Sequence, residues 1–286
     1  MAAPGLILLF CFSYLPMFGI IVAFKNYQFD KGILGSEWVG FSNFEFLFGS
    51  ADAWRITYNT LFLNALFIVC GTLFSILLAL LLNEVGSKLW GSFFQSTFFF
   101  PYILSWVIVG YFAVAFLQDK GFVNSFLSVF GLQGVSWYNH AELWPALLVV
   151  ISIWKGAGYG SIMYLAGMMG ISNEYYESAR IDGANKLQQI AYITLPLIRP
   201  LIIILTLLSI GKIFYADFGM FYNLTNFGNL FSTTDVIDTY VFRALRVTGD
   251  VGMASAAGFY QAVVGFILVL ASNLLVRRLD PDSALF

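Results

Sequence analysis

Residues 56–83 read ITYNTLFLNALFIVCGTLFSILLALLLN, a run without a single Asp, Glu, Lys or Arg. A helix needs about 20 consecutive apolar residues to cross the hydrocarbon core of a bilayer. Three further charge-free runs of sufficient length lie at 1–24, 89–118 and 251–276. Together these runs predict an all-α, polytopic membrane protein.

The composition of the whole chain agrees with that reading. Of the 286 residues 59% are hydrophobic and only 10% are charged, whereas a soluble domain carries about 25% charged residues. The formal net charge of −2 leaves no basic excess for a phosphate backbone, so nucleic acid is excluded as a partner. A single histidine cannot form a multi-histidine metal site. The two cysteines, Cys11 and Cys70, both lie inside apolar runs, so we expect no metal site and no disulfide framework.

Two further apolar segments are interrupted by charges. Lys155 lies within 143–168, and Lys212 and Asp217 lie within 200–220. Counting both segments predicts six spans in one transmembrane domain that covers residues 1–286. These spans lie near 5–24, 60–82, 93–117, 144–168, 198–220 and 255–277.

The orientation follows from the basic residues in the connections. Six spans place both termini on one side of the membrane. The connections on that side, 83–92, 169–199 and 277–286, hold basic residues at nearly twice the density of the others. The positive-inside rule therefore places both termini and the connection 169–197 in the cytoplasm.

The connection 169–197 carries the signals of a short helix outside the membrane. Ser172 or Asn173 can cap the helix, Glu174 and Glu177 suit its positive N-terminal end, and Gly183 can end it. Tyr176, Ala179 and Gly183 recur at i, i+3 and i+7 and would share one face of this helix, with small residues at its centre. The helix could rest on lipid headgroups, but the Lys and Arg enrichment of such helices is absent. The alternative is a helix docked into a groove on a cytoplasmic partner.

The spacing of this connection resembles a known family motif. Glu177-Ser178-Ala179 is followed after three residues by Gly183, and after nine more by Ile193-x-Leu195-Pro196. This pattern resembles the EAA loop of permease subunits of binding-protein-dependent ABC importers, with Ser178 where the family usually has alanine. The resemblance implies a type I ABC importer permease fold with a cytoplasmic coupling helix. It assigns ATPase coupling to Tyr176, Glu177, Ser178, Ala179, Asp182, Gly183, Ile193, Leu195 and Pro196.

Other segments resemble the sugar-type members of this family, of the maltose and multiple-sugar kind. Val39 to Phe44, and Trp54-Arg55 to Asn59-Thr60, resemble the start of the second span in that group. Residues 15–37 and 154–165 are most similar to the branch that imports oligosaccharides and polysaccharides. The resemblance implies a subunit of an ATP-driven carbohydrate importer in the bacterial cytoplasmic membrane, forming half of the translocation pathway.

The same resemblance implies a set of partners. They are a second homologous permease that forms a heterodimer with this one, a cytoplasmic ATPase dimer, an extracytoplasmic solute-binding protein and the lipid bilayer. Gly211-Lys212 is not followed by Ser or Thr and is no P-loop, so this chain should bind no ATP and hydrolyse none. We therefore expect no cofactor in this chain, with ATP and Mg²⁺ held by the partner ATPase.

The two intramembrane lysines are candidates for the substrate pathway. A cation within a span costs about 2.5–3.5 kcal/mol on insertion scales and usually faces a bundle interior or a water-filled cavity. Lys155 and Lys212 each share a helical face with hydroxyl-bearing side chains, and structural pairing with Asp217 is an equally open alternative. The pathway candidates are Ser152, Lys155, Tyr159, Ser209, Lys212, Tyr215 and Asp217.

Rival functions are weaker. An ion-gradient-driven secondary transporter or channel often shows inverted repeats or broken helices, and neither is evident in the sequence. An ABC permease for a non-sugar solute is a closer alternative. A membrane enzyme lacks any supporting cluster of His, Cys or carboxylates.

Overall fold

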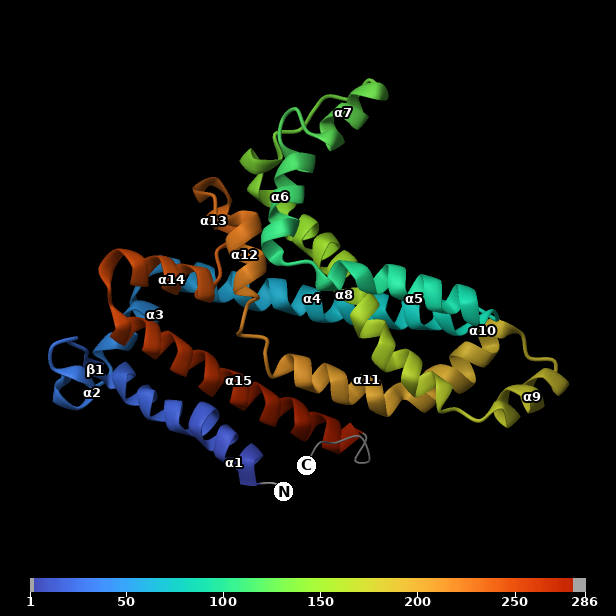
Figure 1. Ribbon diagram of the computed structural model, residues 1–286, viewed down its shortest axis with the longest axis horizontal. Helices are drawn as coiled ribbons and strands as arrows, with labels where there is room; N and C mark the ends of the chain where they lie inside the picture. The colour runs from blue at the N-terminus through green and yellow to red at the C-terminus, as the bar shows by residue number, and fades with distance from the viewer. Residues whose placement is uncertain (1–2, 280–286) are drawn as a thin grey trace.

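The long helices of the computed structural model lie roughly along one axis (Figure 1). The structure describes residues 3–279. Within that range, six helical segments are long and apolar enough to cross a membrane, which confirms the prediction of six spans. These segments are Ala3–Phe24, Asp52–Asn83, Trp106–Val129, Ala141–Met169, Lys186–Ile210 and Val251–Arg278.

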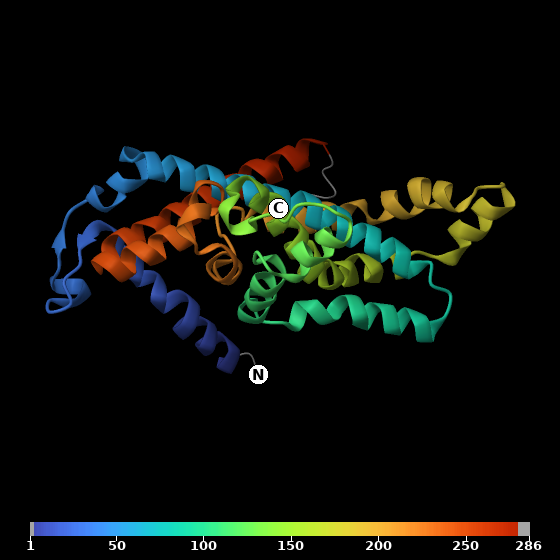
Figure 2. The ribbon, with the colours of Figure 1, turned by 90° about the horizontal axis from the view of Figure 1, so that it is seen from above.

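The first span and the segment that follows it form the edge of the molecule. The span consists of α1 (Ala3–Leu9), a π-helical turn η1 (Phe10–Tyr14) and a 3₁₀ helix η2 (Leu15–Phe24). Only η2 packs closely on α15 (Val251–Leu279), and α1 diverges from the bundle (Figure 2). The next elements are β1 (Lys25–Asn26), α2 (Gly32–Gly35), β2 (Glu37–Trp38), η3 (Ser42–Phe44) and α3 (Glu45–Gly49). β1 and β2 pair antiparallel, Lys25 opposite Trp38.

The remaining elements build the bundle and its two ends. In chain order they are α4 (Ala51–Asn83), α5 (Lys88–Ile103), α6 (Trp106–Leu117), α7 (Phe122–Val129), η4 (Trp137–Asn139), η5 (Ala141–Leu143) and α8 (Trp144–Met169). They continue with α9 (Asn173–Ile181), α10 (Lys186–Gln189), η6 (Ile190–Thr194), α11 (Leu195–Ile210), α12 (Phe218–Thr225), η7 (Gly228–Leu230), α13 (Phe231–Thr234) and α14 (Ile237–Thr248). The helices α9 and α10 lie at one end of the molecule, and the strand pair, α3 and α14 lie at the other (Figure 1).

Glycines on α8 let two neighbouring helices approach it closely. A Cβ at Gly158 would overlap the backbone carbonyl of Phe98 on α5, and a Cβ at Gly160 would overlap the hydroxyl of Ser75 on α4. Small residues allow such close helix contacts where lipid gives no hydrophobic drive for association. α8 is thereby fixed between α4 and α5.

The predicted span 93–117 is not one helix. α5 ends at Ile103, Leu104 and Ser105 are extended, and α6 starts at Trp106 in a new direction (Figure 1). Pro101, in the last turn of α5, lacks a backbone donor and weakens the helix there. The Ser105 hydroxyl accepts a hydrogen bond from the Ile108 backbone N–H at 3.4 Å and so starts α6 as its N-cap.

The predicted span 198–220 is also interrupted. α11 begins at Leu195 and ends at Ile210, and residues 211–217, called here the unwound segment, are not helical. Gly211 follows the last helical residue, and the Asp217 carboxylate accepts a hydrogen bond from the Met220 N–H at 3.2 Å to cap α12. The start of α12 is thus encoded by a local capping residue, whereas Gly211 has an ordinary right-handed φ of −58°.

The arrangement predicts which ends a membrane-impermeant thiol reagent can reach. Leu132, after α7, and Leu187, on α10, are both well exposed. In a background without Cys11 and Cys70, we expect Leu132→Cys to label from outside intact cells, and Leu187→Cys only after permeabilisation. Labelling of Leu187→Cys in sealed cells would reverse the orientation given by the basic residues.

Candidate functional site

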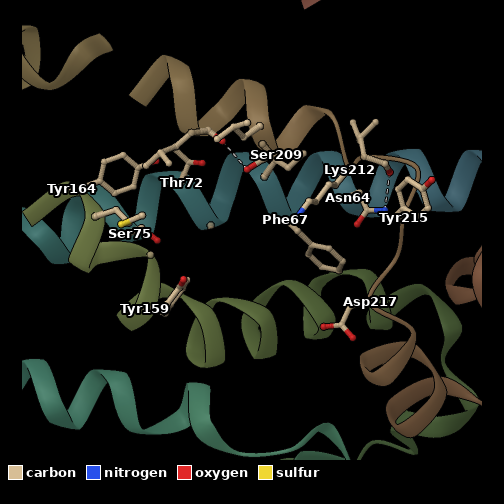
Figure 3. A pocket seen from close by; sticks show the side chains of 17 residues that line it. Asn64, Phe67, Thr72, Ser75, Tyr159, Tyr164, Ser209, Lys212, Tyr215 and Asp217 are labelled. Atoms are coloured by element: carbon tan, nitrogen blue, oxygen red, sulfur yellow. Dashed lines mark hydrogen bonds between the residues drawn. The ribbon is translucent and has the colours of Figure 1, made fainter. Parts of the chain in front are cut away.

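A cavity of about 690 Å³ lies between α4, α8, α11 and the unwound segment 211–217 (Figure 3). One wall is apolar, with Phe67 and Met163 among its side chains. The polar residues that line it are Asn64, Thr72, Ser75, Tyr159, Tyr164, Ser209, Lys212, Tyr215 and Asp217. Non-helical backbone at membrane depth is tolerated where it is buried in protein or lines a cavity. The unwound segment lines this cavity.

The structure brings together five of the seven residues predicted for the pathway. They are Tyr159, Ser209, Lys212, Tyr215 and Asp217. Ser152 and Lys155 are not part of the lining. Since α11 ends at Ile210, Lys212 and Tyr215 reach the cavity from the unwound segment and not from a shared helical face.

Three lining residues of α4 were missing from the sequence prediction: Asn64, Thr72 and Ser75. Their spacing of eight and then three residues keeps them on one side of a helix. A polar stripe at helical spacing inside the charge-free run 56–83 was therefore the signal that could have found them.

The Lys212 ammonium is exposed in the cavity and, among the residues that the structure describes, has no hydrogen-bond or ion-pair partner. Ser209 is satisfied locally, because its hydroxyl donates to the Leu205 carbonyl at 2.9 Å. Tyr159 stacks on Tyr102 with ring centroids 4.3 Å apart, which holds its ring at the cavity wall. Lys212 is thus the cation in this lining that is available to a ligand.

Lys155 has a different environment. Its side chain is buried, and its ammonium donates to the Tyr102 carbonyl at 2.7 Å, near the broken end of α5. The same ammonium lies 5.0 Å from the centre of the Trp106 ring. The Trp106 indole in turn donates to the Asp217 carboxylate at 2.6 Å. Lys155 and Asp217 are therefore linked through Trp106 and not by a direct ion pair.

The connection 169–197 holds a short helix where the sequence predicts one. The Ser172 hydroxyl accepts a hydrogen bond from the Glu174 N–H at 3.3 Å and caps α9. Gly183 has a φ of +83°, and the Ala184 N–H donates to the Ala179 carbonyl at 2.8 Å. This left-handed residue is the usual helix ending for which glycine is suited, so the predicted cap and helix end are both confirmed.

The face that carries Tyr176 and Ala179 is turned toward the rest of the loop. Both residues are half-buried, and the Tyr176 hydroxyl lies 3.0 Å from the Thr194 hydroxyl of η6. The exposed side of α9 instead presents Glu177, Ser178 and Ile181, and the Ile181 side chain is 87% exposed.

The loop is also tied to the second span. The Lys186 ammonium lies 2.6 Å from the Glu84 carboxylate, at the end of α4. Asp182 and Gly183 are exposed at the end of α9, and Ile193, Leu195 and Pro196 lead through η6 into α11. The sequence prediction did not include Ile181 and Leu187, which are 87% and 77% exposed.

These features together define a class of protein. Six apolar spans, a polar cavity at interrupted helices and an exposed helix outside the spans are the parts of a transport permease. Among the described residues, no group of three or more His, Cys, Asp or Glu could hold a metal ion.

The chain belongs to the family of binding-protein-dependent transport system inner membrane components, whose family model matches residues 71–281. It is 38% identical over 284 residues to the polygalacturonan/rhamnogalacturonan transport system permease protein YteP of Bacillus subtilis (strain 168), covering 99% of this chain and 88% of YteP. The predicted family, the six-span permease fold and the multi-pass inner-membrane location are therefore confirmed.

Solved structures agree with the family. A chain of a bacterial ABC transporter involved in the import of the acidic polysaccharide alginate matches with a TM-score of 0.87 and 38% identity, over 97% of this chain and 93% of that chain. A bacterial alginate ABC transporter in complex with alginate pentasaccharide-bound periplasmic protein matches with a TM-score of 0.87 and 37% identity, over 97% and 92%.

The two intramembrane lysines should respond differently to removal of the charge. Lys155→Met leaves the Tyr102 carbonyl without its donor, and an orphaned buried polar group costs about 1–3 kcal/mol. Lys212→Met breaks no contact. We expect a lower melting temperature of the solubilised complex for Lys155→Met and an unchanged one for Lys212→Met. Equal melting temperatures for both variants would contradict the role given to Lys155.

Proposed function

We propose that this chain is the transmembrane subunit of an ATP-driven importer for anionic oligosaccharides or polysaccharides. The cavity at the unwound segment would form half of the translocation pathway. The observation that carries the proposal is the ammonium of Lys212, which has no partner among the described residues. The other polar groups of the lining are tyrosines, hydroxyls, one amide and the Asp217 carboxylate, and that carboxylate already accepts a hydrogen bond from the Trp106 indole.

The chemistry of the lining suits a charged sugar. An ammonium offers three donors to a carboxylate or to ring hydroxyls. Tyr159 and Tyr215 add flat aromatic faces and hydroxyl groups to the same cavity. Pockets of this kind, mostly apolar with a few placed polar groups, are the usual sites for small ligands. The names of YteP and of the alginate transporters support a saccharide and, in the case of alginate, an acidic one.

The partners follow from the family and are part of the proposal. A second permease would close the cavity on the side that this chain leaves open, and a solute-binding protein would deliver the saccharide from outside. A dimer of cytoplasmic ATPases would hold ATP and Mg²⁺ and close on binding them. Closure would move α9 and shift the spans between inward-open and outward-open states.

The interface with the ATPase is proposed to include Tyr176, Glu177, Ser178, Ala179, Asp182, Gly183, Ile193, Leu195 and Pro196. Within this set, Glu177 and Ser178 are exposed for direct contact, whereas Tyr176 transmits force through its hydrogen bond to Thr194. Ile181 joins the direct-contact side, because an apolar side chain so exposed suits a groove on a partner.

A secondary transporter is the alternative that the interrupted helices would favour, since discontinuous helices are common in that class. The family match to binding-protein-dependent systems supports the ATP-driven reading instead. ATP hydrolysis by the purified assembly, stimulated by saccharide-loaded binding protein, separates the two readings.

The pathway proposal predicts a charge-selective loss of uptake. Lys212→Met removes the free ammonium and keeps much of the side-chain length. We expect uptake of an acidic oligosaccharide to fall by about tenfold or more, because a buried carboxylate would lose its counter-charge. Uptake of a neutral oligosaccharide of equal length should fall much less. Equal uptake by wild type and variant of the acidic sugar would contradict the proposal.

The coupling proposal predicts a loss on the cytoplasmic side only. Glu177→Lys reverses a charge on the exposed side of α9, and Ile181→Asp places a charge at its apolar contact. We expect each to reduce binding-protein-stimulated ATP hydrolysis by about tenfold while the complex still assembles. Lys88→Glu, a charge reversal at an exposed residue at the start of α5, on the same side of the membrane as α9, is the matched control. Full stimulation in both α9 variants would remove α9 from the interface.

A further inference from the structure

The backbone of the unwound segment 211–217 needs hydrogen-bond donors that a helix would have supplied. At membrane depth there is little water to satisfy free carbonyls, and each one left without a donor costs several kcal/mol. Two carbonyls of this segment receive side-chain amides. The Asn64 amide donates to the Ile213 carbonyl at 2.9 Å, and the Gln261 amide donates to the Phe214 carbonyl at 2.6 Å.

Gln261 acts together with an aspartate of the outer helix α14. The Gln261 amide also donates to the Asp238 carboxylate at 3.1 Å, and the same carboxylate oxygen accepts a hydrogen bond from the Ala216 N–H at 3.0 Å. The Asp238 carboxylate on α14 thus binds the Ala216 N–H of the unwound segment, and the Gln261 amide on α15 binds its Phe214 carbonyl.

This pair lies on the side of the segment away from the cavity. Gln261 and Asp238 are absent from the cavity lining, where Asn64 is present. Phe214 and Ala216, the residues whose backbone the pair binds, are buried in the protein, at 3% and 9% exposure. Their neighbours Lys212, Tyr215 and Asp217 are exposed toward the cavity (Figure 3).

We propose that Asp238 and Gln261 are positioning residues, which hold the unwound segment so that Lys212 and Tyr215 point into the cavity. The inference rests on the proposed function, because it is the saccharide at that cavity whose binding and passage the pair would serve. It adds two residues that neither touch the cavity nor belong to any motif in the sequence.

The cost of burying the Asp238 carboxyl is offset only in part by its hydrogen bonds. Burial raises its pKa above the usual range, and the bonds from Ala216 and Gln261 act in the opposite direction. A purely local role is the competing explanation, because Asp238 also lies in the first turn of α14, where a negative charge stabilises a helix. The local role depends on the negative charge of Asp238, whereas the positioning role depends on its acceptor oxygen.

The experiment uses the full complex of both permeases, ATPases and binding protein in proteoliposomes. Three variants are compared. Gln261→Met removes the donor at nearly constant length, Asp238→Leu removes the acceptor, and Asp238→Asn keeps an acceptor oxygen but loses the charge. Gln133→Met, at an exposed glutamine outside α7, is the matched control.

Two measurements are made on each variant. The first is the rate at which a hydrophilic thiol reagent labels Lys212→Cys, in a background without Cys11 and Cys70. The second, with Lys212 intact, is the amount of saccharide transported per ATP hydrolysed. Gln261→Met and Asp238→Leu should change the labelling rate by about fivefold or more, which corresponds to the loss of one hydrogen bond. Transport per ATP should fall in the same two variants.

Asp238→Asn and Gln133→Met should match the wild type in both measurements. Labelling and transport per ATP in Gln261→Met equal to those of Gln133→Met would overturn the proposal. So would an Asp238→Asn variant as impaired as Asp238→Leu, because the charge and not the acceptor would then be needed. Normal acidic-sugar uptake by Lys212→Met would instead contradict the proposed function, while the labelling result would still decide whether the pair positions the segment.

Discussion

The structure depends on one constraint, the need to satisfy backbone carbonyls where helices break at membrane depth. At the end of α5 the Tyr102 carbonyl accepts from the Lys155 ammonium. In the unwound segment the Ile213 and Phe214 carbonyls accept from Asn64 and Gln261. Each break is stable because a side chain on a neighbouring helix replaces the lost intrahelical bond. Some intramembrane polar residues that look like substrate ligands in the sequence therefore satisfy backbone carbonyls at a break, as Lys155 does, and others line the cavity, as Lys212 does.

The two breaks also form one unit. The indole of Trp106, the first residue of α6, donates to Asp217, the cap of α12. The ammonium of Lys155 lies over that same indole ring. α8 can carry Lys155 to this point because Gly158 and Gly160 let α5 and α4 lie against it. Close packing on α8 thus places the Lys155 ammonium where it satisfies the break after α5 and lies over the ring of Trp106.

The sequence predicted the class of fold, the spans and the cytoplasmic helix because hydropathy and capping signals are local. It did not predict that 93–117 and 198–220 are interrupted, since apolar composition is the same on both sides of a break. Pro101 and Gly211 were visible signals, but neither shows which distant side chain satisfies the freed carbonyl. Lys155 and Lys212 looked alike for the same reason. Their separate roles arise from tertiary contacts with Tyr102 and Trp106, which no spacing encodes.

The central claim is that a saccharide passes the cavity formed at the unwound segment. Its most direct test is a cryo-electron microscopy structure of the whole complex, arrested with ATP by a hydrolysis-deficient ATPase and supplied with an acidic oligosaccharide. We expect sugar density between α4, α8 and α11, within hydrogen-bond distance of Lys212 or Tyr215, with residues 211–217 still non-helical. Density enclosed wholly by the second permease, or a continuous helix through 211–217, would contradict it.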